Sequence, residues 1–346
     1  MRRYLNTLFV QTEGAWLRKD GTNLVVEVDG VEKGRVPAHL LGGLVCLGRV
    51  GVSPPLLAHC CESGVTVTFL SEQGRFLARV EGPVAGNVLL RKEQYRRSDD
   101  LTATAALVRS FVLAKTLNQR AVLRRALRDH GDGMAEEARA AVEAAERRLT
   151  DIARRAEKDQ GADALRGLEG EAAAAYFAVF DHLIRADEPL FRFRGRSRRP
   201  PLDPVNALLS FLYTLLTHDC RSALETFGLD PAIGFLHRDR PGRPSLALDL
   251  LEEFRPVLAD RLALSLVNRR QLAAGDFRRL ENGAVLLTEE ARKTLLVAFQ
   301  ERKKEELLHP YLQEKAPMGL MPQLQAQLLA RHLRGELDAY PPFVWR

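Results

Sequence analysis

The chain has 346 residues, of which 46% are hydrophobic and 28% are charged, a composition typical of a folded globular protein. Its length exceeds what one hydrophobic core usually serves, so two domains are expected. Lysine and arginine outnumber aspartate and glutamate by 51 to 45, and a clustered excess of this kind favours a polyanionic partner such as nucleic acid.

Cysteine usage and the apolar runs bear on the cellular compartment. The four cysteines include one adjacent pair but no C-x-x-C motif, so they indicate neither a zinc site nor a disulfide framework. No apolar run reaches the ~20 residues that cross a bilayer, and the N-terminal residues do not resemble a signal peptide. We therefore expect a cytoplasmic protein that does not act at a membrane.

Residues 1–85 predict a small β-rich domain. Turn dipeptides such as Asp29-Gly30 follow short apolar stretches with period-two alternation, which predicts hairpins. Between the hairpins, two adjacent prolines predict the start of a short helix. We expect a sandwich-like domain followed by a linker. Strands are expected at residues 23–28, 64–70 and 75–80, the helix at residues 53–64 and the linker at residues 86–97.

From residue 98 to residue 346 the sequence predicts a large all-α domain. The stretch from Asp100 to His130 contains no glycine or proline, and the alanine-rich, charged stretch 134–158 predicts an amphipathic helix. The expected fold class is therefore α+β, with a small β-rich domain followed by a helical one. Further helices are expected at residues 162–183, 203–227, 245–268, 288–308 and 320–337.

Carboxylates interrupt one of these otherwise apolar helices. Asp249, Glu252 and Glu253 stand at i, i+3 and i+4 and share one helix face, and Pro256 predicts a kink or break after them. His237 ends a short apolar run twelve residues before Asp249. The pattern alone leaves two interpretations open, a solvated acidic stripe with an ordinary histidine or a metal site.

Glu169 is a second anomaly. It lies beside the apolar helix face that includes Leu165 and Leu168, and Gly170 next to it costs about 1 kcal/mol of helix propensity relative to alanine. Such breaches of local rules are typical of functional sites, although a glutamate at the rim of an apolar stripe is the alternative. One histidine with two or three carboxylates suits Mg²⁺ or Mn²⁺, and such an ion can polarise a phosphoryl oxygen.

A basic loop between Phe191 and Pro201 is the third feature. Arginine forks match phosphate oxygens, and guanidinium or aromatic faces can stack on bases, so the loop is a candidate DNA-binding segment. A solvated charged loop without a partner is the alternative. The arginines of this loop are Arg192, Arg194, Arg196, Arg198 and Arg199.

Four motifs follow one another along the chain: GLEGEAA at 167–173, PVNALLSFLY at 204–213, GFLH at 234–237 and SLALDLLEEFRP at 245–256. Together, in this order, they resemble the CRISPR-associated endonuclease/integrase family, the catalytic subunit of the spacer-acquisition machinery. The resemblance covers nearly the whole chain. The N-terminal stretches LNTL and CCESG are similar to those of the type I-C branch.

The resemblance implies roles for individual residues. Glu169, His237 and Glu252 would hold Mg²⁺ or Mn²⁺, and Asp249 would be a supporting carboxylate of the catalytic set. Tyr213 and the arginines of the basic loop would position DNA. The partners it implies are double-stranded DNA, as spacer precursor and repeat array, a second copy bound through the β-rich domain, and a small ferredoxin-like companion subunit.

The implied activity is insertion of short foreign DNA fragments into a CRISPR array. A 3′-hydroxyl of the fragment would attack a target phosphodiester, and the metal and nearby arginines would stabilise the pentavalent phosphorane. Two alternatives remain at this point. One is a structure-specific, metal-dependent nuclease of DNA repair, and the other is a non-enzymatic architectural DNA-binding protein.

Overall fold

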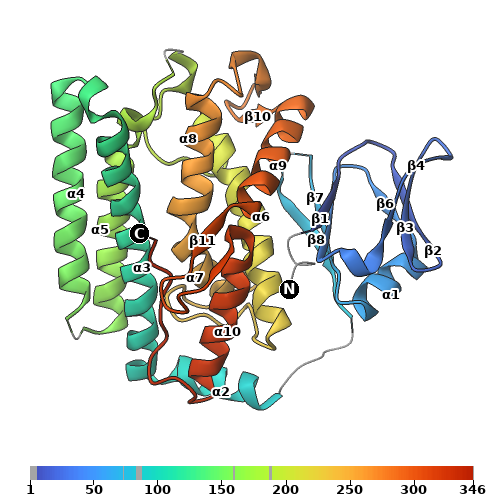
Figure 1. Cartoon of the computed structure of the whole chain (residues 1–346), viewed down its shortest axis with the longest axis horizontal. Coiled ribbons are helices and arrows are strands. Elements are labelled where there is room, and N and C mark those ends of the chain that lie inside the picture. Colours follow the sequence, from blue (N-terminus) through green and yellow to red (C-terminus); the bar gives the residue numbers. More distant parts are fainter. Residues whose placement is uncertain (1–5, 73, 83–87, 159, 187–188, 346) are drawn as a thin grey trace. The chain divides into compact units, whose positions relative to one another are not determined.

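The computed structural model describes residues 6–72, 74–82, 88–158, 160–186 and 189–345 (Figure 1). The chain divides into two compact units, the first formed by Met1–Gly86 with Lys303–Glu305 and the second by the remaining residues. Within the described ranges, no helix is long and apolar enough to cross a membrane.

The first unit contains two four-stranded sheets and one helix. In the sheet ordered β1-β5-β7-β8, β5 pairs in parallel with β1 and β7, and β8 is antiparallel to β7. In the sheet ordered β4-β3-β2-β6, only the β2–β6 pair is parallel. The elements are β1 Thr7–Val10, β2 Trp16–Asp20, β3 Asn23–Val28, β4 Val31–Pro37, β5 Gly43–Leu47, β6 Gly51–Val52, α1 Pro54–Glu62, β7 Thr66–Leu70 and β8 Phe76–Val80.

Both sheets contribute to one hydrophobic cluster. Leu17 and Leu24 come from one sheet, Leu44 and Val67 from the other, and Leu56 from α1. The two expected hairpins are present, as β3–β4 and β7–β8. In the β3–β4 turn, Asp29 and the following glycine both have positive φ, 52° and 76°, as a type I′ turn requires. The sandwich-like β-rich fold expected for this part of the chain is confirmed.

The second unit is built mainly from helices. The carboxylate of Asp100 caps α3 and accepts hydrogen bonds from the amides of Thr102 and Ala103 at 2.7 and 3.0 Å. Helices α3, α4 and α5 lie side by side (Figure 1). The helices are α2 Val88–Asp99, α3 Leu101–His130, α4 Glu136–Ala156, α5 Ala162–Ala178, α6 Pro204–Thr226, α7 Ser245–Phe254, α8 Arg261–Asn268, α9 Glu289–Lys304 and α10 Met321–Leu333.

Some details differ from the sequence-based expectations. Most of the predicted linker 86–97 is helical, because α2 begins at Val88. The helical unit also contains two short antiparallel pairs, so it is not all-α, and the helix expected over 288–308 ends at Lys304. The strands of the two pairs are β9 Phe277–Arg279 with β10 Val285–Leu287, and β11 Glu306–Leu308 with β12 Lys315–Pro317.

The break expected at Pro256 takes the form of a π-helical turn. Helix α7 ends at Phe254, residues Arg255–Asp260 are π-helical, and α8 follows. Pro256 has no amide hydrogen to donate to the carbonyl of Glu252, so the α-helical hydrogen-bond ladder fails there. The wider turn brings Arg255 and Asp260 to the wall of the same cavity that Glu169 lines.

Candidate functional site

Three helices bring two acidic side chains and one lysine together. Glu169 comes from α5, Glu252 from α7 and Lys115 from α3. The Lys115 ammonium is ion-paired with Glu169 and lies 2.8 Å from Glu252 Oε2. The side chain of Glu252 is 2% exposed and that of Glu169 is 26% exposed. The two candidate metal-binding carboxylates therefore share one buried cation.

His237 is held in place by Asp249. The Asp249 carboxylate, fully buried, accepts hydrogen bonds from the amides of Phe235, Leu236 and His237 at 2.6, 3.0 and 2.8 Å. Its Oδ1 also lies 2.7 Å from His237 Nδ1. With Nδ1 engaged in this way, Nε2 is the nitrogen available to a ligand, and it lies 3.9 Å from Glu252 Oε1. Asp249 thus acts through His237.

The loop that carries His237 contacts both α5 and α7. Arg166 of α5 donates to the carbonyls of Leu236 and Phe235, each at 2.7 Å. A Cβ at Gly234 would come within 2.7 Å of Ser245 Cβ on α7, so only glycine allows this approach. The role of Arg166 was not predicted from the sequence. Its position three residues before Glu169, on the same helix face, was the signal that could have indicated it.

Neighbouring charges keep Glu252 ionised. Burial alone would raise the pKa of Glu252, but Arg255 and Lys115 bring it down to about 2. The Arg255 guanidinium lies 2.6 Å from Glu252 Oε1. A carboxylate that stays ionised in a buried position suits a cation-binding role.

The adjacent Glu253 is held differently. Its carboxyl oxygens accept hydrogen bonds from Tyr340 Oη at 2.6 Å, the Phe343 amide at 2.7 Å and Gln325 Nε2 at 3.0 Å. Burial raises the pKa of Glu253 to about 8. Glu253 therefore anchors the C-terminal segment and lies outside the candidate site. Because all three carboxylates of α7 are buried, the interpretation as a solvated acidic stripe is wrong.

The chemistry of the donor set fits a divalent ion. Glu169 and Glu252 offer carboxylate oxygens and His237 offers Nε2, a set that suits Mg²⁺ or Mn²⁺. Among the described residues, no three His, Cys, Asp or Glu side chains stand close enough together to hold an ion as they are. At this site the Lys115 ammonium lies between the two carboxylates.

Two cavities adjoin these residues. One, of about 250 Å³, is lined by Glu169, Gly170 and Lys115 among others, and a Cβ at Gly170 would meet nothing within 4 Å. The second, of about 540 Å³, is lined by His237 and by six arginines. Those arginines are Arg196, Arg198, Arg199, Arg240, Arg243 and Arg255.

The basic loop divides into arginines that face these cavities and arginines that do not. Arg198 and Arg199 are exposed at the larger cavity. Arg192 is paired with Asp181 at 3.2 Å, and Arg194 is exposed but is not among the described residues that line either cavity. The loop's phenylalanines, 191 and 193, are 1% and 5% exposed and belong to the core, so they offer no faces to DNA bases.

Tyr213 lies beneath two arginines rather than at the surface. The guanidinium carbons of Arg196 and Arg255 stand 5.0 and 4.5 Å from the centroid of its ring. Its hydroxyl lies 2.6 Å from Asp260 Oδ1, and the residue is 9% exposed. The burial favours a role in positioning the two guanidinium groups at the cavity wall, in place of direct contact with DNA.

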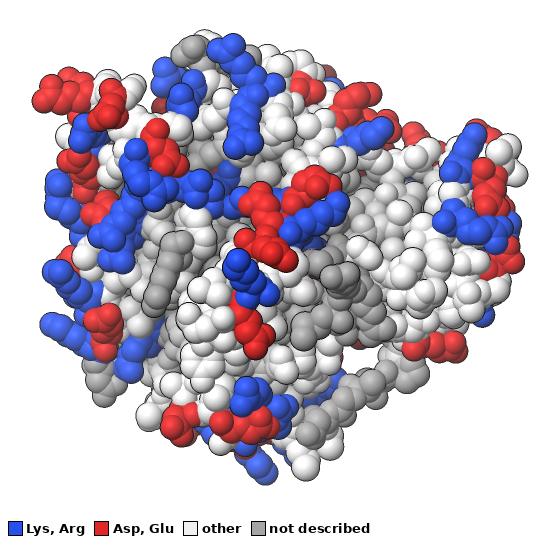
Figure 2. All heavy atoms as spheres, viewed as in Figure 1, with Lys and Arg blue, Asp and Glu red and all other residues white. Residues whose placement is uncertain are grey.

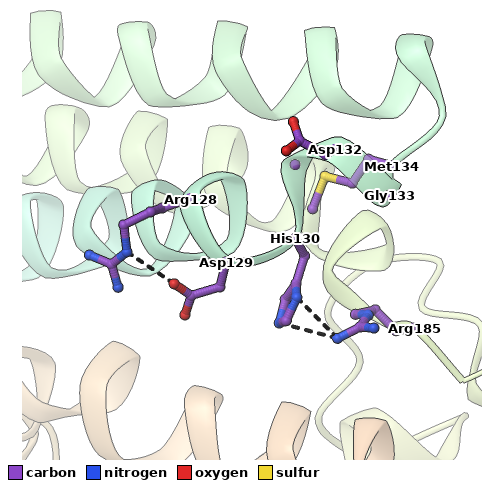
Figure 3. Close-up of a pocket in the computed structure, with 8 residues that line it drawn as sticks. Arg128, Asp129, His130, Asp132, Gly133, Met134 and Arg185 are labelled. Carbon is purple, nitrogen blue, oxygen red and sulfur yellow. Dashed lines mark hydrogen bonds and ion pairs between the residues drawn. The ribbon is translucent and has the colours of Figure 1, made fainter.

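Another cavity, of about 280 Å³, lies at the C-terminal end of α3 and contains none of the predicted site residues (Figure 3). Its charges are mixed. Arg128 donates to Asp129 at 3.0 Å, and Arg185 Nη1 lies 3.1 Å from His130 Nδ1. Figure 2 shows the same mixture over α3 to α5, where basic side chains gather with acidic ones among them. The six-arginine cavity is the more uniform cationic surface.

Comparisons with known proteins show the family of the chain. The family model described as CRISPR associated protein Cas1 matches residues 8–301. The chain belongs to the Cas1 family. A curated relative named CRISPR-associated endonuclease Cas1 2, from Rhodospirillum rubrum, is 64% identical over the whole of both chains. The resemblance drawn from the four motifs is thereby confirmed at the level of the family, and the type I-C branch stays a prediction.

Solved structures share the fold. A Cas1 protein from Thermotoga maritima, at 22% identity, has a TM-score of 0.81 over 99% of this chain and all of its own. A casposase bound to an integration product, at 21% identity, has a TM-score of 0.83 over 98% of this chain and 94% of its own. The expected α+β class is confirmed by these matches.

Proposed function

We propose that this chain is a metal-dependent DNA endonuclease and integrase that inserts short DNA fragments as spacers into a CRISPR array. One observation carries the proposal. Glu169, Glu252 and the Asp249-bound His237 converge beside an arginine-lined cavity, in a chain 64% identical to a protein named a CRISPR-associated endonuclease. A casposase bound to an integration product shares the fold, which is consistent with strand transfer by such a site.

Glu169, His237 and Glu252 are the residues that would hold Mg²⁺ or Mn²⁺. When bound, the ion would supply Lewis-acid stabilisation of charge at the reacting phosphate and its leaving oxygen. Asp249 would fix the ring of His237 and raise the basicity of its Nε2, as carboxylate partners of metal-binding histidines do. The burial of Glu252 and the hydrogen bond between Asp249 and His237 restrict the geometry of the donor set before the substrate arrives.

The arginines of the larger cavity would bind the phosphates of the DNA. Arg196 and Arg255, stacked on Tyr213, keep their guanidinium groups at the cavity wall, where they would stabilise the negative charge that develops during phosphoryl transfer. A 3′-hydroxyl held in line with the scissile phosphorus would attack, and the target strand's 3′-oxygen would leave. Holding the two groups together supplies a large part of the barrier reduction.

The partners proposed for the chain extend this function. Double-stranded DNA would serve both as the fragment and as the repeat array that receives it. A second copy would bind through the β-rich first unit, where a two-fold interface would use the same patch on both chains. A small ferredoxin-like companion subunit would complete the assembly.

Strand transfer is the experiment that tests the proposal. We expect purified protein with Mn²⁺, the companion subunit and a labelled duplex with 3′-hydroxyl ends to join that duplex covalently to a supercoiled plasmid carrying a repeat array. Replacing the 3′ ends by dideoxy ends should eliminate the joined product, because the nucleophile is then missing. Gel electrophoresis of relaxed, labelled plasmid measures the outcome. Nicking at full rate without any joined product would favour a structure-specific repair nuclease instead.

The arginine-lined cavity makes a second prediction. Replacing Arg198 and Arg199 together by glutamine should weaken duplex binding broadly across sequences. Each lost phosphate contact should reduce the slope of log K against log salt by about 0.9. Fluorescence anisotropy at several salt concentrations measures this slope, and the α4 surface pair Arg139→Gln with Arg147→Gln serves as the control. Equal slopes in both double variants would mean that Arg198 and Arg199 make no phosphate contact.

A further inference from the structure

Lys115 occupies the place between the two candidate metal-binding carboxylates. Its ammonium is ion-paired with Glu169 and lies 2.8 Å from Glu252 Oε2, and its side chain is 6% exposed. The other oxygen of Glu252, Oε1, lies 2.6 Å from Arg255 Nη1 and 3.9 Å from His237 Nε2. The ammonium therefore uses oxygens that an ion held by Glu169, His237 and Glu252 would need.

Charge balance makes the ammonium and a divalent ion alternatives at this position. A histidine that binds metal is neutral, so the charges of Glu169 and Glu252 are already balanced by Lys115 and Arg255. Asp249, bound to His237, adds one further negative charge, so a divalent ion bound with the ammonium still in place would leave this cluster with a net charge of +1 where water screens poorly. Displacing Lys115 removes this excess charge and frees the carboxylate oxygens to turn toward the ion.

The structure leaves room for the displaced side chain. Lys115 itself lines the cavity of about 250 Å³, together with Gln119, Gly170 and Arg198. A lysine carries its charge on a flexible four-carbon stem, so we expect its ammonium to turn into this cavity when it is displaced.

We propose that Lys115 is a resident counter-cation, which holds Glu169 and Glu252 in place in the metal-free protein and is displaced when a divalent ion binds. The inference rests on the proposed function, because it requires that Glu169, His237 and Glu252 hold the ion. Lys115 is then a positioning residue that sets the threshold for metal binding. It lowers the apparent affinity of the site while keeping the empty site assembled.

The test measures metal binding without DNA or turnover. Lys115→Met keeps the apolar stem and removes the charge, so isothermal titration calorimetry with Mn²⁺ should give a Kd lower by about tenfold or more. Without metal, the variant should have a lower Tm, because its two carboxylates then repel each other. Saturating Mn²⁺ should raise its Tm by more than it raises that of the wild type. Lys293→Met, at an exposed position of α9, should leave the Kd and both Tm values unchanged.

Lys115→Gln is measured in parallel, because its amide can still donate to a carboxylate oxygen and support the fold. A merely structural lysine predicts Mn²⁺ binding that is equal or weaker in both variants, and that result would overturn the inference. If the wild type binds Mn²⁺ and cleaves DNA while both variants keep its Kd, the Lys115 role fails and the proposed function stands. If the wild type binds no Mn²⁺, both fail together.

Discussion

Glu252→Gln is expected to lower the rates of DNA cleavage and strand transfer by roughly 10²- to 10³-fold or more. This is the scale on which single preorganised electrostatic contacts act in enzymes. The change replaces one carboxylate oxygen by an NH2 group and leaves the side-chain volume nearly unchanged. Glutamine is preferable to alanine here, since its remaining oxygen can still accept a hydrogen bond from a buried cation, whereas an alanine would leave Lys115 and Arg255 without any partner at this position. Such a loss costs about 3–5 kcal/mol of stability.

Glu169→Gln and His237→Ala should have effects of the same size, because each removes one donor of the proposed set. Glu171→Gln is the matched control for Glu169. Its carboxylate pairs with Arg155 at 3.1 Å and with Arg148 at 3.4 Å on the face toward α4, so its loss should leave activity intact. Cleavage of labelled branched DNA with Mn²⁺ measures these three variants and Glu252→Gln. Near-wild-type cleavage by Glu169→Gln, His237→Ala or Glu252→Gln would remove that residue from the metal site.

The adjacent glutamate supplies a second control. Glu253 lies one residue from Glu252 on the same buried helix, and its carboxyl group contacts the C-terminal segment rather than Lys115. Glu253→Gln therefore tests a neighbouring carboxyl group outside the metal site. This variant should retain cleavage. Equal losses of activity in Glu252→Gln and Glu253→Gln would mean that the assay reports a general disturbance of α7 and not the loss of a metal ligand.

Local periodicity was enough to predict most of the regular structure. The glycine- and proline-free stretch after Asp100 became α3, and the turn at Asp29 joined the strands that alternation had predicted. One error came where glycine and proline predicted a linker over residues 86–97, whereas α2 begins at Val88. Pro256 predicted a kink or break, and the break is present, although the sequence could not show that it takes the form of a π-helical turn between α7 and α8.

The candidate site was predictable only as a set of separate anomalies. Glu169, His237 and Glu252 each broke a local rule, yet bringing them together needed the family resemblance, because they lie on three elements far apart in sequence. Lys115 was missed for the same reason. A lysine within the apolar face of a helix is an anomaly too, and its partners, Glu169 and Glu252, are 54 and 137 residues away.

Glu252 and Glu253 illustrate the limit of sequence patterns most directly. Both are carboxylates on one helix, and spacing cannot assign them different roles. The difference arises because the chain's last residues return to α7, where Tyr340 and Phe343 bond Glu253 from 87 and 90 residues away. Asn118 of α3 joins the same network, since its Nδ2 donates to the carbonyls of Glu253 and Phe343 at 2.7 and 2.9 Å.

That network should make stability depend on pH in a defined direction. The folded-state pKa of Glu253, about 8, exceeds its ordinary value of 4.5. Below pH 4.5 both folded and unfolded chains hold the proton, so the stabilising contribution is complete. Between pH 4.5 and 8 the folded chain keeps a proton that the unfolded chain has released, so the free energy of unfolding falls as pH rises. Above pH 8 the contribution is lost.

Comparison with Glu253→Gln isolates this contribution, because the amide does not titrate and every other ionisable group is common to both proteins. We expect the wild type to lose stability relative to the variant between pH 5 and pH 8, by up to about 1.4 kcal/mol per pH unit for one proton. Urea unfolding at a series of pH values gives the two curves. Asp260, whose pKa burial raises to about 6, contributes equally to both and cancels. Parallel curves would show that Glu253 is ionised in the folded protein, and the network would then hold a buried carboxylate anion in place of a carboxylic acid.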